Sequence, residues 1–242
     1  RVDVRDPIKV ENCLRDVNPD IVINCAGLLI AESEKTRGDA ILINSFFPHL
    51  LSRLGDKLNY RLIHISTDCV YSGEKGGYSE SSSPDGESVY ARTKALGELI
   101  NQADLIVRTS AIGPDLKIEG SGLLSWFLKQ KGEIEGFTHA FWTGVTTLEL
   151  AKGIDSFITQ ELSGIYNFVP QDKISKYELL LLLKKVWKKE NVQILPKKEP
   201  ENDKSLINNR KDLNFTVKNY KAMLYELREY IQLNSSLYPD YQ

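Results

Sequence analysis

Long hydrophobic runs and a dominant charge are both missing from this sequence. The run Leu179–Leu183 has five residues, whereas a helix that spans a bilayer needs about 20. The net charge is −2 over 242 residues, and no basic stripe or basic amphipathic helix marks a nucleic-acid or membrane partner. We therefore expect a cytoplasmic protein with neither kind of partner, which holds anionic ligands locally rather than by a global field.

Cysteine and histidine are scarce as well. The three cysteines, Cys13, Cys25 and Cys69, lack metal-ligand spacing, and a disulfide framework prefers an even number. None of the three histidines has a neighbouring ligand at metal spacing. The sequence therefore predicts reduced thiols and no metal site, and His64, inside an apolar run, is interpreted as a buried, hydrogen-bonded core residue.

Strand and helix patterns alternate in the first half of the chain. Short apolar, β-branched runs, typical of strands buried on both faces of a parallel sheet, occupy residues 21–26, 61–66 and 104–108, with a further one at 164–169. Helical patterns occupy residues 8–17, 38–55 and 88–102. This alternation predicts an α/β fold with a doubly wound parallel sheet.

The second half is less regular. Helices are expected at residues 122–130, 146–158 and 219–233. Ser175 and Glu178 form a capping box for another helix at 176–189. The charged, proline-bearing stretch 196–203 is expected to be a loop.

Tyr90 and Lys94 are the first candidate catalytic pair. Residues four apart on a helix share one face, and a nearby ammonium lowers the pKa of a phenol by stabilising the phenolate. Such a pair can exchange a proton with a carbonyl or alcohol oxygen. A half-buried tyrosine beside a solvated lysine is the alternative interpretation, since this spacing often arises by chance.

Two further segments follow predicted strands. Ser66-Thr67-Asp68 places hydroxyls at the carboxyl end of one strand, where open parallel sheets bind ligands. A hydroxyl there can donate to a substrate oxygen, although all three residue types also cap helices and turns. Asn24-Cys-Ala-Gly27 ends the preceding strand with small residues that let a flat cofactor approach, or that simply form a turn.

Taken in order, these segments resemble the extended short-chain dehydrogenase/reductase family, most of all its dTDP-4-dehydrorhamnose reductase group. The resemblance is dense over residues 2–110 and weaker afterwards. It rests on Asp3-Val-Arg-Asp6, Pro19-Asp-Ile-Val-Ile-Asn-Cys-Ala-Gly27, Asn44 with Pro48, His64-Ile-Ser-Thr-Asp-Cys-Val-Tyr-Ser-Gly73, Tyr90-Ala-Arg-Thr-Lys-Ala-Leu-Gly-Glu98 and Val107-Arg-Thr-Ser110.

The resemblance implies a Rossmann-type dinucleotide-binding domain at residues 1–113 and 137–169, with a substrate-binding lobe at 114–136 and 170–242. It implies an NAD(P)H-dependent reductase of a 4-keto nucleotide-diphospho-sugar in polysaccharide biosynthesis, without a choice between NADP and NAD. Tyr90 would donate the proton. Lys94 would tune the acidity of Tyr90 and bind the nicotinamide ribose. Thr67 would orient the carbonyl, with Ser66 as second candidate.

The remaining implied roles concern the cofactor and the sugar. Asp3, beside Val4, matches an acidic residue near the adenine ring, while Ala26, Gly27 and Leu28 would line the cofactor with support from Asn44. Ser110 and Ala111 fall at the sugar. Rhamnose-forming reductases have a tryptophan at the position of Ala111, so Trp142 is a candidate replacement, or else a core residue.

The glycine-rich phosphate turn of dinucleotide-binding folds is not found ahead of Asp3. We expect that the preceding strand and turn are missing from the chain as given, because Thr67, Tyr90 and Lys94 would be idle if dinucleotide binding had been lost.

Two alternatives remain open. One is epimerisation or dehydration on the same fold, which Asp68-Cys69 after Thr67 disfavours because dehydratases tend to carry an Asp-Glu pair there. The other is a non-catalytic regulatory subunit, like the β subunit of methionine adenosyltransferase, since fold and function separate easily. The oligomeric state is open too, with a homodimer as one candidate.

Overall fold

Four parallel strands form the main sheet of the computed structural model, which describes residues 2–99, 101–116 and 122–241. They are β1 (Ile21–Asn24), β2 (Arg61–Ile65), β3 (Leu105–Arg108) and β8 (Gly164–Asn167), in the order β1-β2-β3-β8. All four residues of β3 are buried, as the near-continuous apolar runs of a two-sided parallel sheet require. The predicted α/β class and parallel sheet are confirmed, with strand ends within two residues of those expected.

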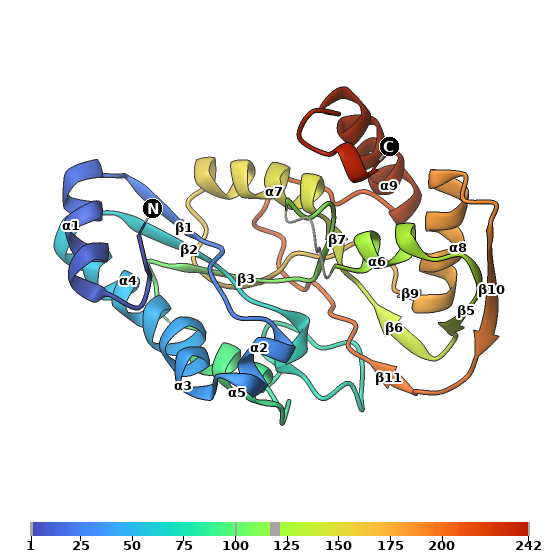
Figure 1. Ribbon diagram of the computed structural model, residues 1–242. Helices are drawn as coiled ribbons and strands as arrows, with labels where there is room; N and C mark the ends of the chain where they lie inside the picture. The colour runs from blue at the N-terminus through green and yellow to red at the C-terminus, as the bar shows by residue number, and fades with distance from the viewer. Residues whose placement is uncertain (1, 100, 117–121, 242) are drawn as a thin grey trace.

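Helices cover both faces of this sheet (Figure 1). One helical stretch joins β1 to β2 through α3 (Arg37–Ala40), a π-helical segment (Ile41–Phe46) and α4 (Phe47–Leu58). The other helices around the sheet are α1 (Pro7–Val17), α2 (Ile30–Lys35), α5 (Val89–Leu96) and α7 (Thr147–Thr159). Since α4 and α5 lie on one side and α7 on the other, the sheet is doubly wound.

The smaller lobe, on the right of Figure 1, carries two short sheets. In one, β5 (Gly132–Phe137) pairs with β10 (Val192–Lys197). In the other, β6 (Ala140–Trp142) pairs with β9 (Ile174–Ser175) and β11 (Asn202–Asp203). β6 thus joins the sheet of this lobe although it falls within the predicted dinucleotide-binding range 137–169.

Short elements complete the structure. The helices α6 (Leu123–Lys129), α8 (Lys176–Trp187) and α9 (Tyr220–Leu233) pack on the smaller lobe, and β4 (Ala111–Ile112) pairs with β7 (Val145–Thr146) between the two halves. Two 3-10 turns span Asp68–Val70 and Pro239–Tyr241. Residues 117–121 of the predicted substrate lobe, and position 100 of the predicted helix 88–102, lie outside the described residues.

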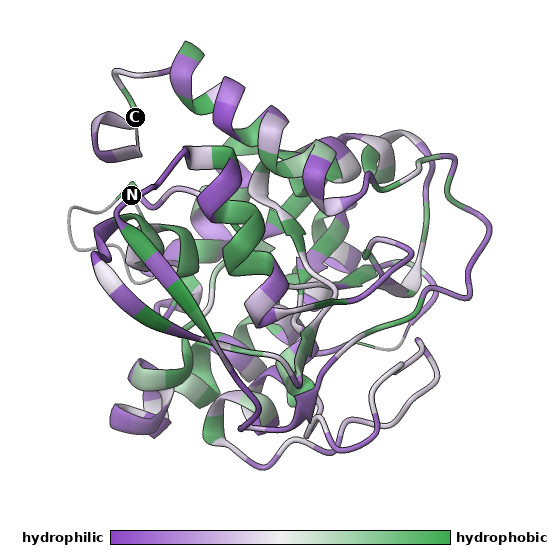
Figure 2. Cartoon of the chain, turned by 90° about the vertical axis from the view of Figure 1, so that its right-hand side faces the viewer, coloured by the Kyte–Doolittle hydropathy of each residue, from purple (hydrophilic) through white to green (hydrophobic). Residues whose placement is uncertain are grey.

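One hydrophobic core is shared by the main sheet and the smaller lobe. Ile63, Leu105 and Val107 on one face of the sheet belong to the same cluster as Phe127 and Leu183 of the lobe. The opposite face packs Leu62 and Ile106 against α1 and α4. The helices carry alternating hydrophobic and hydrophilic bands, as expected of elements with one buried face (Figure 2). The shared core fixes the ends of the main sheet relative to the lobe.

The capping box predicted at Ser175 and Glu178 is confirmed, because each side chain bonds the main chain of the other. Two predictions were wrong in extent. The helix expected to reach residue 102 ends at Leu96, before Gly97. The stretch 196–203, expected to be a loop, contains the end of β10 and all of β11, since Pro196 is tolerated where only one neighbouring strand is paired.

Within the described residues, no helix combines the length and apolar character that crossing a membrane demands.

Candidate active site

A cavity of about 520 Å³ lies at the carboxyl edge of the main sheet. Parallel strands end there together, so the segments that follow β1, β2 and β3 meet at this edge. The lining residues that the sequence singled out are Ala26, Gly27, Leu28, Ser66, Thr67, Tyr90, Lys94, Ser110 and Ala111. The structure therefore brings the three catalytic candidates and most of the predicted cofactor and substrate residues to one place.

Helix α5 presents Tyr90 and Lys94 to this cavity. Its first turn is closed by Ser88, whose hydroxyl accepts from the main-chain N–H of Ala91 at 3.1 Å. Directly after the helix, Gly97 packs so tightly that a Cβ there would overlap the main-chain oxygen of Asn44. The cap at Ser88 and the close contact at Gly97 hold the two ends of the helix in place. They thereby position Tyr90 and Lys94, which lie one turn apart.

Lys94 is almost fully buried, with 4% of its surface exposed. Its ammonium group donates to the main-chain carbonyl of Ile65 at 2.9 Å and lies 3.4 Å from Nε2 of His64. Burial lowers the pKa of Lys94 to about 8, against the weaker opposing effects of Glu98 and Cys25. The lysine is thus turned toward β2 in this state.

The phenol of Tyr90 has a pKa raised to about 12, mainly by burial and despite a hydrogen bond with Thr67. This is opposite to the direction that the sequence predicts from a neighbouring ammonium. The physical reason is that desolvation disfavours the phenolate while the Lys94 ammonium is held by Ile65. In this state Tyr90 is a protonated donor at neutral pH.

Of the two candidate hydroxyls, Thr67 is the better placed. Ser66 donates to Oε1 of Glu98 at 2.7 Å, and that carboxylate forms a buried ion pair with Arg108 at 2.7 Å. The hydroxyl of Thr67 instead hydrogen-bonds with the phenol of Tyr90. Its bond to Oδ1 of Asp68 measures 3.2 Å, which is longer than the bond from Ser66 to Glu98. Ser66 is therefore committed to the ion pair, which leaves Thr67 beside the phenol.

Asn44 supports the cavity wall from behind. It is fully buried in the π-helical segment, a helix type that is rare and is frequently found at functional sites. Its amide accepts from the N–H of Leu28 at 2.8 Å, donates to the Leu28 carbonyl at 3.1 Å and reaches the hydroxyl of Thr93 at 3.2 Å. Asn44 thereby ties the loop after β1 to α5.

Three predicted residues lie elsewhere. Asp3 is exposed and pairs with Arg5 at 2.8 Å, and the hydrogen bonds from Arg5 lower the pKa of its carboxyl to about 2. Val4 borders a separate apolar cavity of about 250 Å³ along β1. Trp142 is buried in the shared core, where its main-chain carbonyl accepts from Tyr220, and is not among the residues that line the active-site cavity.

The cavity fits the nicotinamide end of a dinucleotide. Small residues after β1 form an open wall suited to a flat ring, and Lys94 supplies a buried donor for a ribose hydroxyl. These lining residues suit the reacting end of the cofactor.

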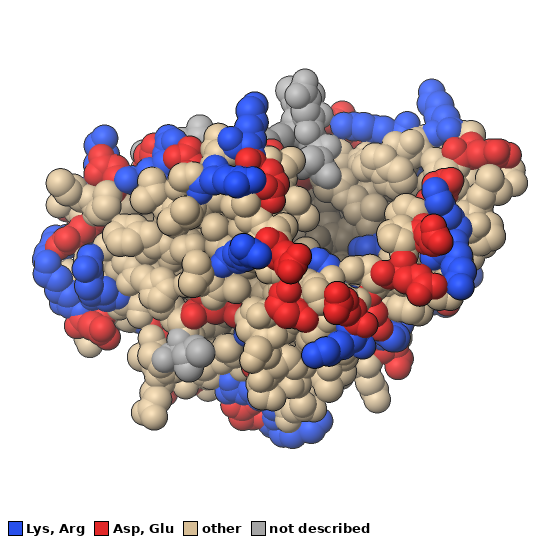
Figure 3. Space-filling view, turned by 90° about the horizontal axis from the view of Figure 1, so that it is seen from below, with Lys and Arg blue, Asp and Glu red and all other residues tan. Residues whose placement is uncertain are grey.

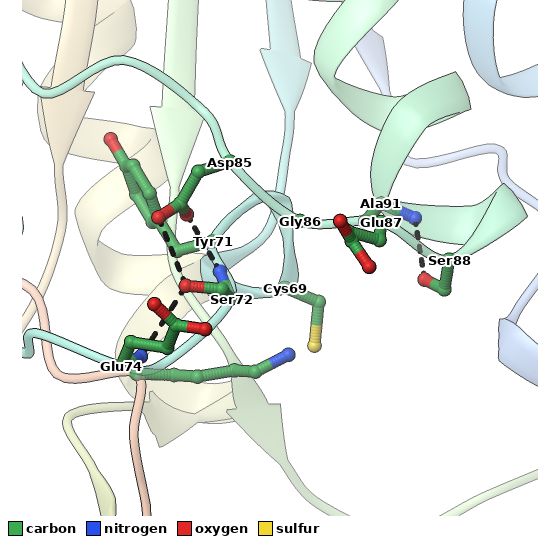
Figure 4. Close-up of a pocket in the computed structure, with 10 residues that line it drawn as sticks. Cys69, Tyr71, Ser72, Glu74, Asp85, Gly86, Glu87, Ser88 and Ala91 are labelled. Carbon is green, nitrogen blue, oxygen red and sulfur yellow. Dashed lines mark hydrogen bonds between the residues drawn. The ribbon is translucent and has the colours of Figure 1, made fainter.

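A second cavity, of about 410 Å³, adjoins the first at Cys69, which lines both. Its wall carries the carboxylates of Glu74, Asp85 and Glu87. Figure 4 shows Asp85 accepting from the main chain and hydroxyl of Ser72, at 2.7 and 2.9 Å. Viewed from below, the molecule is hollowed between its two halves, with Lys or Arg side chains in the hollow and acidic ones at its rim (Figure 3).

Sequence reasoning missed several cavity residues. Leu29, Ile30 and Glu32 line the cavity from α2 and its start, but this six-residue helix has no side-chain cap to signal it. The Glu98–Arg108 pair was missed because only the fold brings the segment after helix α5 next to strand β3. His64 was interpreted correctly as buried, with 0% exposure and both ring nitrogens near polar partners.

A model of the RmlD substrate binding domain family matches residues 1–208. The chain belongs to this family. Its RmlD-type fold is shared with a crystal structure of dTDP-4-dehydrorhamnose reductase from Bacillus anthracis in complex with NADP. The TM-score is 0.81 and the sequence identity 23%, over 96% of this chain and 87% of the other.

Curated relatives of this RmlD family member match over shorter stretches. The dTDP-4-dehydrorhamnose reductase of Mycobacterium tuberculosis is 35% identical over 102 residues, which are 40% of this chain and 33% of the relative. Methionine adenosyltransferase 2 subunit beta of Xenopus laevis is 23% identical over 192 residues, 74% of this chain and 58% of the relative. The matched region thus spans between a third and three-fifths of these relatives.

Proposed function

We propose that this chain forms the reacting part of an NAD(P)H-dependent reductase that acts on a 4-keto nucleotide-diphospho-sugar. The observation that carries the proposal is the convergence of Thr67, Tyr90 and Lys94 on one cavity. A proton donor, a hydroxyl and a buried cation at the carboxyl edge of a parallel sheet are the groups that carbonyl reduction needs.

Each of these residues has a distinct task. The nicotinamide cofactor, when bound, supplies the hydride. Tyr90 donates its proton to the carbonyl oxygen, and Thr67 holds that oxygen by a hydrogen bond. Lys94 binds the ribose, and its positive charge offsets the negative charge that Tyr90 acquires as it gives up its proton.

Burial of the phenol suits this direction of reaction. With its pKa raised to about 12, Tyr90 keeps its proton throughout the neutral range. The same desolvation strengthens its interaction with a developing oxyanion, because electrostatic effects grow as the local dielectric falls.

The names of the relatives support this assignment. The Mycobacterium tuberculosis relative is called a dTDP-4-dehydrorhamnose reductase, and the Bacillus anthracis structure contains NADP. Ala111 at the cavity leaves more room than a large aromatic side chain would, so we propose a 4-keto sugar other than, or in addition to, the rhamnose precursor.

Turnover by the full-length protein tests the proposal. We expect oxidation of NADPH or NADH on adding a 4-keto nucleotide sugar, lost in Tyr90→Phe and retained in Tyr225→Phe. Tyr225 is 40% exposed on α9, away from the cavity, and is the matched control. Equal activity of Tyr90→Phe and wild type would contradict the proposal.

A regulatory subunit is the second candidate, favoured by the match to the methionine adenosyltransferase subunit over 74% of this chain. Such a protein would bind dinucleotide without turnover of any keto sugar. The same assay separates the two functions, because only the enzyme couples cofactor oxidation to the presence of Tyr90.

A further inference from the structure

A buried polar chain connects β1 to Lys94 through a histidine. The side-chain amide nitrogen of Asn24 lies 3.0 Å from Nδ1 of His64, and Nε2 of His64 lies 3.4 Å from Nζ of Lys94. The three side chains are 3%, 0% and 4% exposed, so their hydrogen bonds lie almost entirely inside the protein.

The orientation of Asn24 decides which nitrogen of His64 carries the proton. The main-chain N–H of Ala26 donates to Oδ1 of Asn24 at 3.0 Å, which turns the amide NH₂ group toward the ring. An NH₂ group only donates, so Nδ1 must accept. The neutral ring then carries its proton on Nε2, the atom that faces Lys94.

This tautomer opposes a charged Lys94. An ammonium has three donors and no lone pair, so the Nε2–H of His64 and the protonated Nζ confront each other as two donors. A neutral amine accepts from Nε2–H and still donates to the carbonyl of Ile65 at 2.9 Å. The hydrogen bonds are therefore all satisfied only when Lys94 is uncharged.

We propose that Asn24 and His64 form a positioning pair that disfavours the ammonium form of Lys94 and so sets the pH at which this lysine becomes charged. The consequence for catalysis rests on the proposed reductase function. Because a charged Lys94 assists Tyr90, the Asn24–His64 pair would determine the pH above which activity falls.

Other titratable groups near the pair also act on Lys94 and His64. Glu98 and Cys25 raise the pKa of Lys94, and burial outweighs both. Glu98 is also held by Arg108 at 2.7 Å. For His64, burial and then the Lys94 charge lower the pKa, His49 acts weakly in the same direction, and the main-chain carbonyl of Asn24 opposes them. His64 thus stays neutral, as the tautomer argument requires.

The substitution Asn24→Asp reverses the arrangement with little change of shape. One carboxylate oxygen keeps the bond from Ala26, while the other accepts from Nδ1–H, so Nε2 loses its proton and accepts from the Lys94 ammonium. We expect the midpoint of Lys94 titration to rise by about one pH unit, or about tenfold in proton affinity. His64→Gln, whose amide oxygen can face Lys94, should raise it in the same direction if the first variant fails to fold.

The measurement is ¹⁵N NMR of the histidine rings of the full-length protein, with a Lys ¹³Cε titration of the same samples. The given sequence contributes His49, His64 and His139 to the spectrum, and His49→Gln serves as assignment aid and control because His49 is exposed on α4. We expect an unprotonated Nδ1 in the wild type, a protonated Nδ1 in Asn24→Asp, and no change at His64 in His49→Gln.

A protonated Nδ1 in the wild type, or a Lys94 midpoint unmoved in both variants, would overturn the proposal. Absence of turnover with an unprotonated Nδ1 would instead count against the reductase function alone. If the alkaline limb of the pH–rate profile moves to higher pH in Asn24→Asp, the Asn24–His64 pair controls turnover as well as the charge of Lys94.

Discussion

The two ends of the candidate cofactor site are built in opposite ways. At the reacting end, Thr67 and Lys94 are 7% and 4% exposed, and their neighbours are held by buried hydrogen bonds. At the end predicted to meet the adenine, Asp3 is half exposed and pairs with Arg5, which also reaches Asp39 at 3.2 Å. From this contrast we expect a preorganised reacting end, and an adenine end that would depend on weaker, solvent-screened contacts.

The same contrast separates two ion pairs. Glu98 and Arg108 are 4% and 2% exposed and bind Ser66 and Tyr71 as well. Asp3 and Arg5 lie in solvent. Removing one partner of a buried pair leaves an uncompensated charge, while removing an exposed partner leaves a hydrated one. Substitutions at the buried end and at the exposed end should therefore have effects of very different size.

The largest expected effect is on turnover at the buried end. Tyr90→Phe removes the proposed proton donor and should lower kcat by about 10²–10⁴-fold, the usual contribution of general acid catalysis. Cofactor affinity should stay within about twofold, because the lost hydroxyl contributes mainly to the transition state. Steady-state kinetics with a fluorescence titration of the cofactor would measure both, and a weakened affinity with unchanged kcat would contradict this role.

The next effect is on stability. Arg108→Met strands the buried carboxylate of Glu98 and should cost about 3–5 kcal/mol of unfolding free energy. Arg5→Met, the matched change at the exposed end, should leave the urea midpoint unchanged. Similar midpoints for the two variants would show that burial does not distinguish these pairs.

Lys94→Met should stabilise the protein while abolishing turnover. The pKa of Lys94 falls from 10.5 in the unfolded chain to about 8 in the fold, so the unfolded state binds more protons between these values and stability rises with pH there. Below pH 8 the charged lysine costs about 3 kcal/mol, and above about pH 10.5 that cost is gone.

Urea titrations of the two proteins at matched pH would measure this difference. The advantage of Lys94→Met should be largest at pH 7 and should shrink as the pH rises. A constant difference between pH 7 and 10 would show that the effect is one of packing and not of charge burial.

The smallest effect is expected at the exposed end. Asp3→Asn should weaken cofactor binding by about fivefold, the value of one ordinary hydrogen bond, with kcat unchanged. Calorimetric titration with NADH and NADPH would measure it. A large fall in kcat would mean that this end is as tightly coupled to the chemistry as the other.

Local sequence patterns predicted which residues meet at the cavity. The strand runs around Val22 and Ile63 and the spacing of Tyr90 and Lys94 are encoded within a few residues, and parallel strand ends gather them without further information. What the sequence could not supply was the direction of the Tyr90 pKa, because that depends on burial and on the engagement of Lys94 by Ile65.

The smaller lobe was harder to predict for a related reason. Its strands β5 and β10 pair across more than 50 residues, and neither shows the clean alternation that marks a strand on its own. Trp142 illustrates the same limit: the sequence left a cavity wall and a core position both open, and the contacts that bury it in the core come from Tyr220 and Lys176, far away in sequence.

The most decisive experiment on the cofactor site is a titration of the full-length protein with NADPH and NADH, followed by cofactor fluorescence. We expect saturable binding of at least one cofactor that survives Tyr90→Phe and is weakened by Lys94→Met, because we propose that Lys94 holds the ribose. Failure of both cofactors to bind would contradict a dinucleotide site at this cavity and, with it, the proposed hydride transfer.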